Sequence, residues 1–160
     1  MVRLKPITNR DQVSGDALVA FDSIIGSRNR INGPHSIMMY APEVARSSTA
    51  LSDALRFGGN LSNHDTELAI ITAARHWDCD YVWASHSVAA LKAGVRPEAV
   101  DIVANGGHLD GLTPEEAVIV RYGRELMEEH HVSQEAFDSA LHQFGEANTV
   151  VLGALMGYMY

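Results

Sequence analysis

The sequence has only one cysteine, Cys79, so no disulfide can form within the chain. It also lacks an apolar run near the roughly 20 residues that a membrane-spanning helix needs. Residues 1–12 are polar and have no apolar stretch typical of a secretory signal. These absences are typical of a protein in a reducing compartment, so we expect a cytoplasmic protein without a membrane partner.

Positive charge is scarce as well. The 160 residues include 12 Lys and Arg against 20 Asp and Glu, which gives a formal net charge of -8. Nucleic acids and anionic membrane surfaces are bound through a surplus of Lys and Arg, so this balance argues against both as partners. A small-molecule substrate is the partner that we expect instead.

Strand-like alternation is nearly absent, and apolar residues recur at helical spacing throughout. The clearest helix start is the capping box Thr113-Pro114-Glu115-Glu116, which has proline at the first helical position. We predict an all-α, single-domain protein of about seven or eight helices, with a Gly- and Pro-bearing loop over residues 31–40. The predicted helices cover 13–26, 42–58, 62–77, 78–94, 97–106, 114–130 and 133–144, and a final apolar segment follows Gly145.

The final segment, residues 150–160, is apolar on nearly every side. A helix of this kind needs burial all round, either at the centre of the fold or against another subunit. We favour the second interpretation and expect a homo-oligomer.

Two ionisable residues lie on apolar faces of consecutive predicted helices. Glu67 shares its face with Ile70 and Ile71, and His86 shares its face with Ala90. Because a tight connection joins these helices, the simplest packing brings both side chains into one partly dry pocket. Such a pair can orient an imidazole and transfer a proton near neutral pH. A histidine on an apolar face is also typical of a buried structural residue, so both interpretations stay open.

Other residues near this pair are candidates for the same site. Cys79 stands at the start of a helix and seven residues before His86, where the helix dipole favours a thiolate, although a cysteine is equally typical of a small buried residue. We expect the substrate-binding residues to be His64, Tyr81, Val82 and Trp83. No CxxC, HExxH or glycine-rich phosphate loop is present, so we predict neither a metal nor an organic cofactor.

Four segments of the chain form a recognisable block: 67–70 (ELAI), 74–75 (AR), 79–86 (CDYVWASH) and 92–95 (KAGV). Together they resemble the signature of the carboxymuconolactone decarboxylase family, which includes the alkylhydroperoxidase-D-like proteins. The resemblance extends from about Pro42 through residues 112–114 to 157–158. It implies an alkylhydroperoxidase-D-like helical bundle that assembles as a trimer or hexamer, with residues 1–41 as an N-terminal helix and loop and 42–160 as the family-like core.

The peroxidase branch of that family carries a glutamate, two cysteines three residues apart, and a histidine. Glu67, Cys79 and His86 match three of these positions, but Val82 stands where the second cysteine would be. Valine cannot attack a peroxide or form a disulfide, so a two-cysteine cycle is not available within one chain.

The resemblance therefore implies a cofactor-independent lyase of aromatic catabolism, acting on a small carboxylated lactone or keto acid. His86 would donate a proton, and Glu67 would act as a base or hold the imidazole in one tautomer. Two alternatives stay open. The first is a thiol-dependent peroxidase that uses Cys79 alone, and the second is a non-catalytic helical oligomer.

Overall fold

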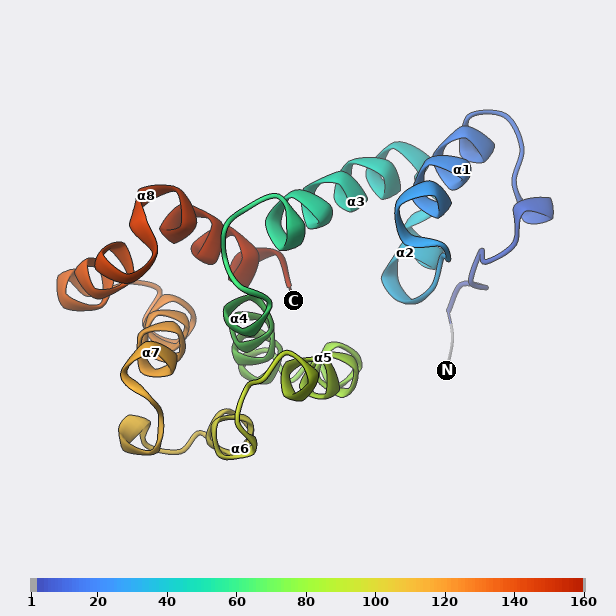
Figure 1. Cartoon of the computed structure of the whole chain (residues 1–160). Helices are drawn as coiled ribbons and strands as arrows, with labels where there is room; N and C mark the ends of the chain where they lie inside the picture. The colour runs from blue at the N-terminus through green and yellow to red at the C-terminus, as the bar shows by residue number, and fades with distance from the viewer. Residues whose placement is uncertain (1–2, 160) are drawn as a thin grey trace. The chain divides into compact units, whose positions relative to one another are not determined.

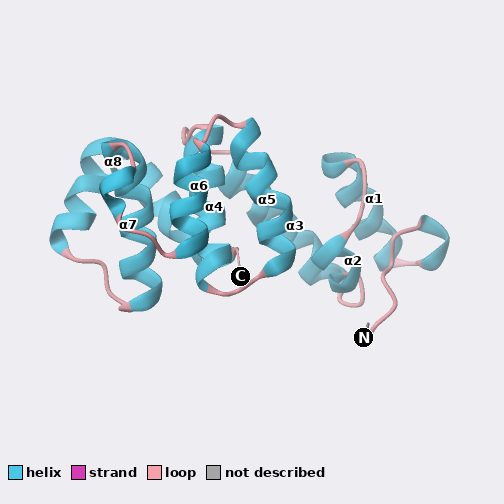
Figure 2. Ribbon diagram, turned by 90° about the horizontal axis from the view of Figure 1, so that it is seen from below, coloured by secondary structure: helices cyan, strands magenta, loops and turns pink. Residues whose placement is uncertain are grey.

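The computed structural model describes residues 3–159, which contain eight α-helices, two short 3₁₀ helices and no strand (Figure 1, Figure 2). The all-α prediction is thus confirmed. None of the described helices is long and apolar enough to cross a membrane. In chain order the elements are η1 (Arg10–Gln12), α1 (Asp16–Arg28), α2 (Gly33–Met38), α3 (Pro42–Phe57), α4 (Asn63–His76), α5 (Asp80–Lys92), α6 (Pro97–Asn105), η2 (Leu109–Gly111), α7 (Pro114–Glu128) and α8 (Gln134–Tyr158).

The chain divides into two compact units, Met1–Ala54 and Leu55–Tyr160. The division falls inside α3, so the last turn of that helix belongs with the second unit. We predicted one domain, with a change of character between residues 41 and 42. The single domain stays a prediction, and the division lies about one helix further along the chain than that change.

The first unit has its own small core, which includes Phe21 and Ile24 of α1 and Met39. The predicted loop over residues 31–40 is wrong, because α2 occupies most of it. Gly33 and Pro34 suggested a break in the chain, yet proline is favoured in the first turn of a helix, and here it opens one. Burial of Met39 against the first unit's core stabilises this short helix.

α4 is the central helix of the second unit, and it contacts α5, α6, α7 and α8. All nine residues from Thr66 to Ala74 are buried. A helix that is buried on every side needs neighbours on every side, and this explains its place in the fold. Ser62 caps its N-terminus by accepting a hydrogen bond from the backbone amide of Asp65.

α8 bends at Gly145, whose φ of 73° and ψ of 171° are not helical, so the predicted break at this glycine is confirmed. Beyond it, Leu152, Leu155 and Met156 are buried in the core of the second unit, whereas Val150 is 72% exposed. The final segment is therefore buried on one side within its own chain. Burial of the other side against a second subunit stays a prediction.

Candidate functional site

Glu67 lies in the buried stretch of α4, and only 7% of its surface is exposed. A carboxylate in such a place loses its hydration and needs partners that replace the lost water. Two side chains from neighbouring helices supply them. Nδ1 of His86 lies 2.7 Å from Oε2 of Glu67, and Nη2 of Arg56 lies 3.3 Å from Oε1. Each carboxylate oxygen thus has its own partner.

His86 comes from α5, and 14% of its side chain is exposed. If the Glu67 carboxylate is ionised it can only accept, and the hydrogen of this contact then lies on Nδ1 of His86. That arrangement leaves Nε2 for another partner. The structure brings together the two residues that helical spacing placed on facing apolar stripes, while their catalytic role stays a prediction.

Arg56 was not among the residues predicted for the site. It stands in the last turn of α3, where an arginine is adequately explained by the helix dipole, so no local pattern distinguishes it. Its guanidinium carbon lies 4.9 Å from the centre of the Phe57 ring, and its side chain is 21% exposed. The Nε atom is buried and has no hydrogen-bond partner among the described residues.

Arg56, Glu67 and His86 therefore form a chain of polar contacts across α3, α4 and α5. An imidazole held through Nδ1 by a carboxylate can accept or donate a proton at Nε2, and this is the arrangement that general acid–base catalysis needs. The arginine adds a positive charge at the other end of the carboxylate. Such a chain suits proton transfer to or from a small molecule.

The other predicted site residues differ in how far they are buried. Cys79 is the N-cap residue of α5 and is a free, partly exposed thiol. Val82 and Trp83 are partly buried and pack against the core of the second unit, and their role in binding substrate stays a prediction. Tyr81 is 56% exposed, so most of its side chain faces away from the core.

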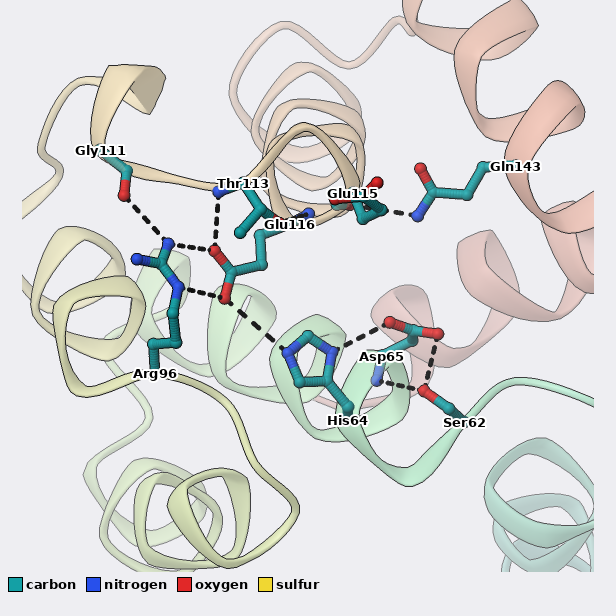
Figure 3. A network of polar contacts seen from close by, with 9 residues as sticks. All are labelled: Ser62, His64, Asp65, Arg96, Gly111, Thr113, Glu115, Glu116 and Gln143. Carbon is teal, nitrogen blue, oxygen red and sulfur yellow. Dashed lines mark hydrogen bonds and ion pairs between the residues drawn. The ribbon is translucent and has the colours of Figure 1, made fainter.

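His64 belongs to a different network (Figure 3). Its Nδ1 lies 3.0 Å from Oδ1 of Asp65, and its Nε2 lies 3.8 Å from Oε1 of Glu116 on α7. Neither Glu67 nor His86 is among these contacts. His64 thus lies one turn before Glu67 in sequence but faces the N-terminus of α7.

Glu116 is the centre of that second network, and only 2% of its surface is exposed (Figure 3). Arg96 contacts both of its oxygens and also donates to the carbonyl of Gly111, while the backbone amide of Thr113 donates to Oε2. Burial alone would raise the pKa of Glu116. The hydrogen bonds from Arg96 and from the Thr113 backbone, together with the charges of Arg96 and His64, outweigh burial and hold the pKa of Glu116 below its ordinary value. The Thr113 capping box is confirmed, and its glutamate also stabilises the packing of α7.

Among residues 3–159, no three or more His, Cys, Asp or Glu side chains gather in a way that could hold a metal ion. Independence from metals and organic cofactors stays a prediction. The polar chain of Arg56, Glu67 and His86 is the candidate site that the geometry supports.

Comparison with known proteins adds one finding. A family model described as the carboxymuconolactone decarboxylase family matches residues 42–125, more than half of the chain. The match begins where the predicted resemblance begins and includes Arg56, Glu67 and His86. It ends within α7, so the predicted resemblance of the C-terminal helix lies outside it. No curated protein matches the sequence.

Proposed function

Because the chain belongs to the carboxymuconolactone decarboxylase family, we propose that it is a lyase that uses Glu67 and His86 for acid–base chemistry. Its substrate would be a small carboxylated lactone or keto acid, and no organic cofactor would take part. The observation that carries the proposal is the 2.7 Å contact between Nδ1 of His86 and Oε2 of Glu67 in a largely buried site. A proton-transfer group needs this combination of fixed geometry and low hydration.

The proposed reaction is decarboxylation. The bond between the substrate carbon and its carboxylate breaks, carbon dioxide leaves, and the electron pair remains on carbon as an enolate-like anion. His86, protonated on both nitrogens, gives its Nε2 proton to that carbon and becomes neutral. Glu67 balances the imidazolium before the transfer and keeps Nδ1 protonated after it, and solvent then returns the lost proton.

The first test measures carbon dioxide release from a panel of carboxylated lactones and keto acids. Glu67→Gln and His86→Ala should each lower kcat by about 100-fold or more, since a positioned acid or base contributes roughly 10²–10⁴. His108→Ala is a matched control, because His108 is exposed and is not one of the polar partners of Glu67 and His86 described above. Turnover that survives both Glu67→Gln and His86→Ala would disprove the proposal.

Cys79 allows the single-thiol peroxidase to be tested in the same preparation. Without a second cysteine, the sulfenic acid formed by a peroxide would need an external thiol to reduce it. Peroxide consumption with excess dithiol should therefore be compared between the wild type and Cys79→Ser. Consumption that depends on Cys79 would replace the lyase with a peroxidase, and inactivity in every assay would favour a non-catalytic protein.

Assembly into a homotrimer or homohexamer is part of the same proposal. The exposed apolar side chains of α5, Tyr81, Val88 and Leu91, support it, because they recur at helical spacing on one side of the helix. Sedimentation equilibrium would measure the mass, and a monomer at micromolar concentration would count against it.

A further inference from the structure

Arg56 and Arg96 both pair with a buried glutamate, but they do so in different ways. Arg96 uses Nε and Nη2 on the two oxygens of Glu116, at 3.3 and 2.5 Å, and also donates to a backbone carbonyl at 3.0 Å. Arg56 makes one contact, from Nη2 to Oε1 of Glu67, at 3.3 Å. Arg96 therefore has the full set of bonds expected of a structural ion pair, and Arg56 does not.

The unsatisfied atom of Arg56 strengthens this contrast. Its Nε is buried without a partner among the described residues. An unpaired buried donor costs free energy, so side chains chosen for stability alone seldom keep one. What the position of Arg56 does achieve is a positive charge at Oε1 of Glu67, while Oε2 remains available to His86.

The turn after α3 holds Arg56 in that position. The backbone amide of Asn60 donates to Oδ1 of Asn148 on α8 at 3.2 Å. A Cβ atom added at Gly59 would lie 3.6 Å from the same Oδ1 and 3.8 Å from Val151, so the turn packs closely on α8. The turn is thereby fixed with respect to α8, which packs in turn on α4, the helix that carries Glu67.

We propose that Arg56 is a positioning residue for the Glu67–His86 pair. It holds the Glu67 carboxylate at Oε1 so that Oε2 accepts the Nδ1 hydrogen of His86, which selects the Nδ1–H tautomer and leaves Nε2 as the proton-transfer atom. The inference rests on the proposed function for its catalytic consequence. The effect of Arg56 on the tautomer of His86 can be measured without any substrate.

The experiment reads the tautomer of His86 from long-range ¹H–¹⁵N correlations of its ring. The chain has eight histidines, and comparison with a His86→Gln variant assigns the signal. Spectra are recorded over a pH series, and the tautomer is taken from the alkaline end, where the ring signals no longer change with pH. The wild type should show Nδ1–H, Arg56→Gln should show a mixture or Nε2–H, and Arg56→Lys, which keeps the charge, should restore Nδ1–H.

Arg96→Gln is the matched control, because it removes an arginine from a buried glutamate of the same unit and should leave the His86 tautomer unchanged. Nε2–H in the wild type would overturn the inference, and so would an unchanged tautomer in folded Arg56→Gln. Even if Arg56→Gln does not fold, Nε2–H in the wild-type spectrum would still overturn the inference.

Turnover supplies the second readout. On a substrate that the wild type decarboxylates, Arg56→Gln should lower kcat by about 10- to 100-fold, less than loss of the acid itself, with KM changed by less than about threefold. Arg56→Lys should recover most of that loss. A raised KM with unchanged kcat would overturn the positioning role, because Arg56 would then bind substrate.

The two readouts separate the two proposals. If the wild type decarboxylates no substrate, the proposed function fails, while the tautomer still decides whether Arg56 positions the pair. If the wild type is active and Arg56→Gln keeps both its tautomer and its kcat, only the role of Arg56 fails.

Discussion

Replacement of Glu67 should be costly for stability, and by an amount that depends on the replacement. Its side chain is 10% exposed and receives one short contact from His86 and one longer contact from Arg56. A hydrogen bond to a charged group contributes about 1.5–3 kcal/mol, and each donor left unpaired costs about 1–3 kcal/mol. Glu67→Ala leaves His86 and Arg56 without their shared acceptor, so we expect the free energy of unfolding to fall by about 3–5 kcal/mol, the range for breaking a buried ion pair.

Glu67→Gln keeps the shape and one acceptor oxygen but loses the charge. His86 can still donate to the amide oxygen, so we expect a smaller loss, about 1–2 kcal/mol. In a double-mutant cycle with His86→Ala, the coupling free energy between the two residues should be about 1–3 kcal/mol. The same Glu67→Gln variant should lose at least about 99% of its turnover, because an amide cannot balance an imidazolium.

Urea unfolding followed by tryptophan fluorescence would measure these losses. Both tryptophans of the chain, Trp77 and Trp83, lie in the second unit, so their signal reports the unit that contains the site. Unchanged m-values would show that wild type and variants expose similar amounts of surface on unfolding, so that their free energies of unfolding can be compared. A coupling free energy below about 0.5 kcal/mol would refute the description of Glu67 and His86 as a buried, interacting pair.

Three further perturbations test other features of the second unit. Gly123→Ala should destabilise the second unit by about 1 kcal/mol, because the new Cβ would lie 2.9 Å from Cγ2 of Thr72 and the cost of overpacking exceeds the gain in helix propensity. Gly157→Ala, whose new Cβ would have nothing within 4 Å, should be neutral or stabilising by up to about 1 kcal/mol. Because the folded-state pKa of Glu116 is lowered, its contribution to stability is fully present above the unfolded pKa of about 4.3 and is lost as the pH falls below it. In urea titrations between about pH 5 and 3, the free energy of unfolding of Glu116→Gln should therefore fall less steeply with pH than that of the wild type. Cys79→Ser should keep decarboxylase activity within about twofold and should be neutral or slightly stabilising, by up to about 1 kcal/mol, because serine is a better N-cap residue.

Each of these has a result that would contradict it. Equal effects of alanine at Gly123 and Gly157 would show that α7 does not approach α4 as closely as described. An acid transition unchanged by Glu116→Gln would mean that other carboxylates control acid unfolding. Loss of all activity in Cys79→Ser would return the thiol to the centre of the mechanism.

Helix positions were largely predictable because their signals are local. Ser62 and Thr113 each cap the helix that follows them, and both helices begin where these residues predict. Gly145 breaks α8 because only glycine readily takes a positive φ there. The sequence failed at residues 31–40, where Gly33 and Pro34 are compatible with either a loop or a helix start, and packing of Met39 decided between them.

The residues of the candidate site were likewise predictable only in part. Glu67 and His86 could be found because each is a polar residue on an apolar stripe, and such a residue needs a partner wherever the helix packs. His64 contacts Asp65 and Glu116, because a position one turn away on the same helix can face a different neighbour, and its role in substrate binding stays a prediction. Arg56 could not be found at all, since an arginine in a last helical turn is common on any exposed helix.

By itself the sequence determined most of the helices, the family signature and the pair of ionisable residues, because periodicity, capping and residue type act over a few neighbouring positions. Only the tertiary structure decided which oxygen of Glu67 each partner takes, that Arg56 completes the chain, and that His64 joins Glu116 instead. Those contacts join residues from different helices, 11 to 52 positions apart, and their distances depend on how the helices pack. Packing is a property of the whole unit, and no short segment of the sequence contains it.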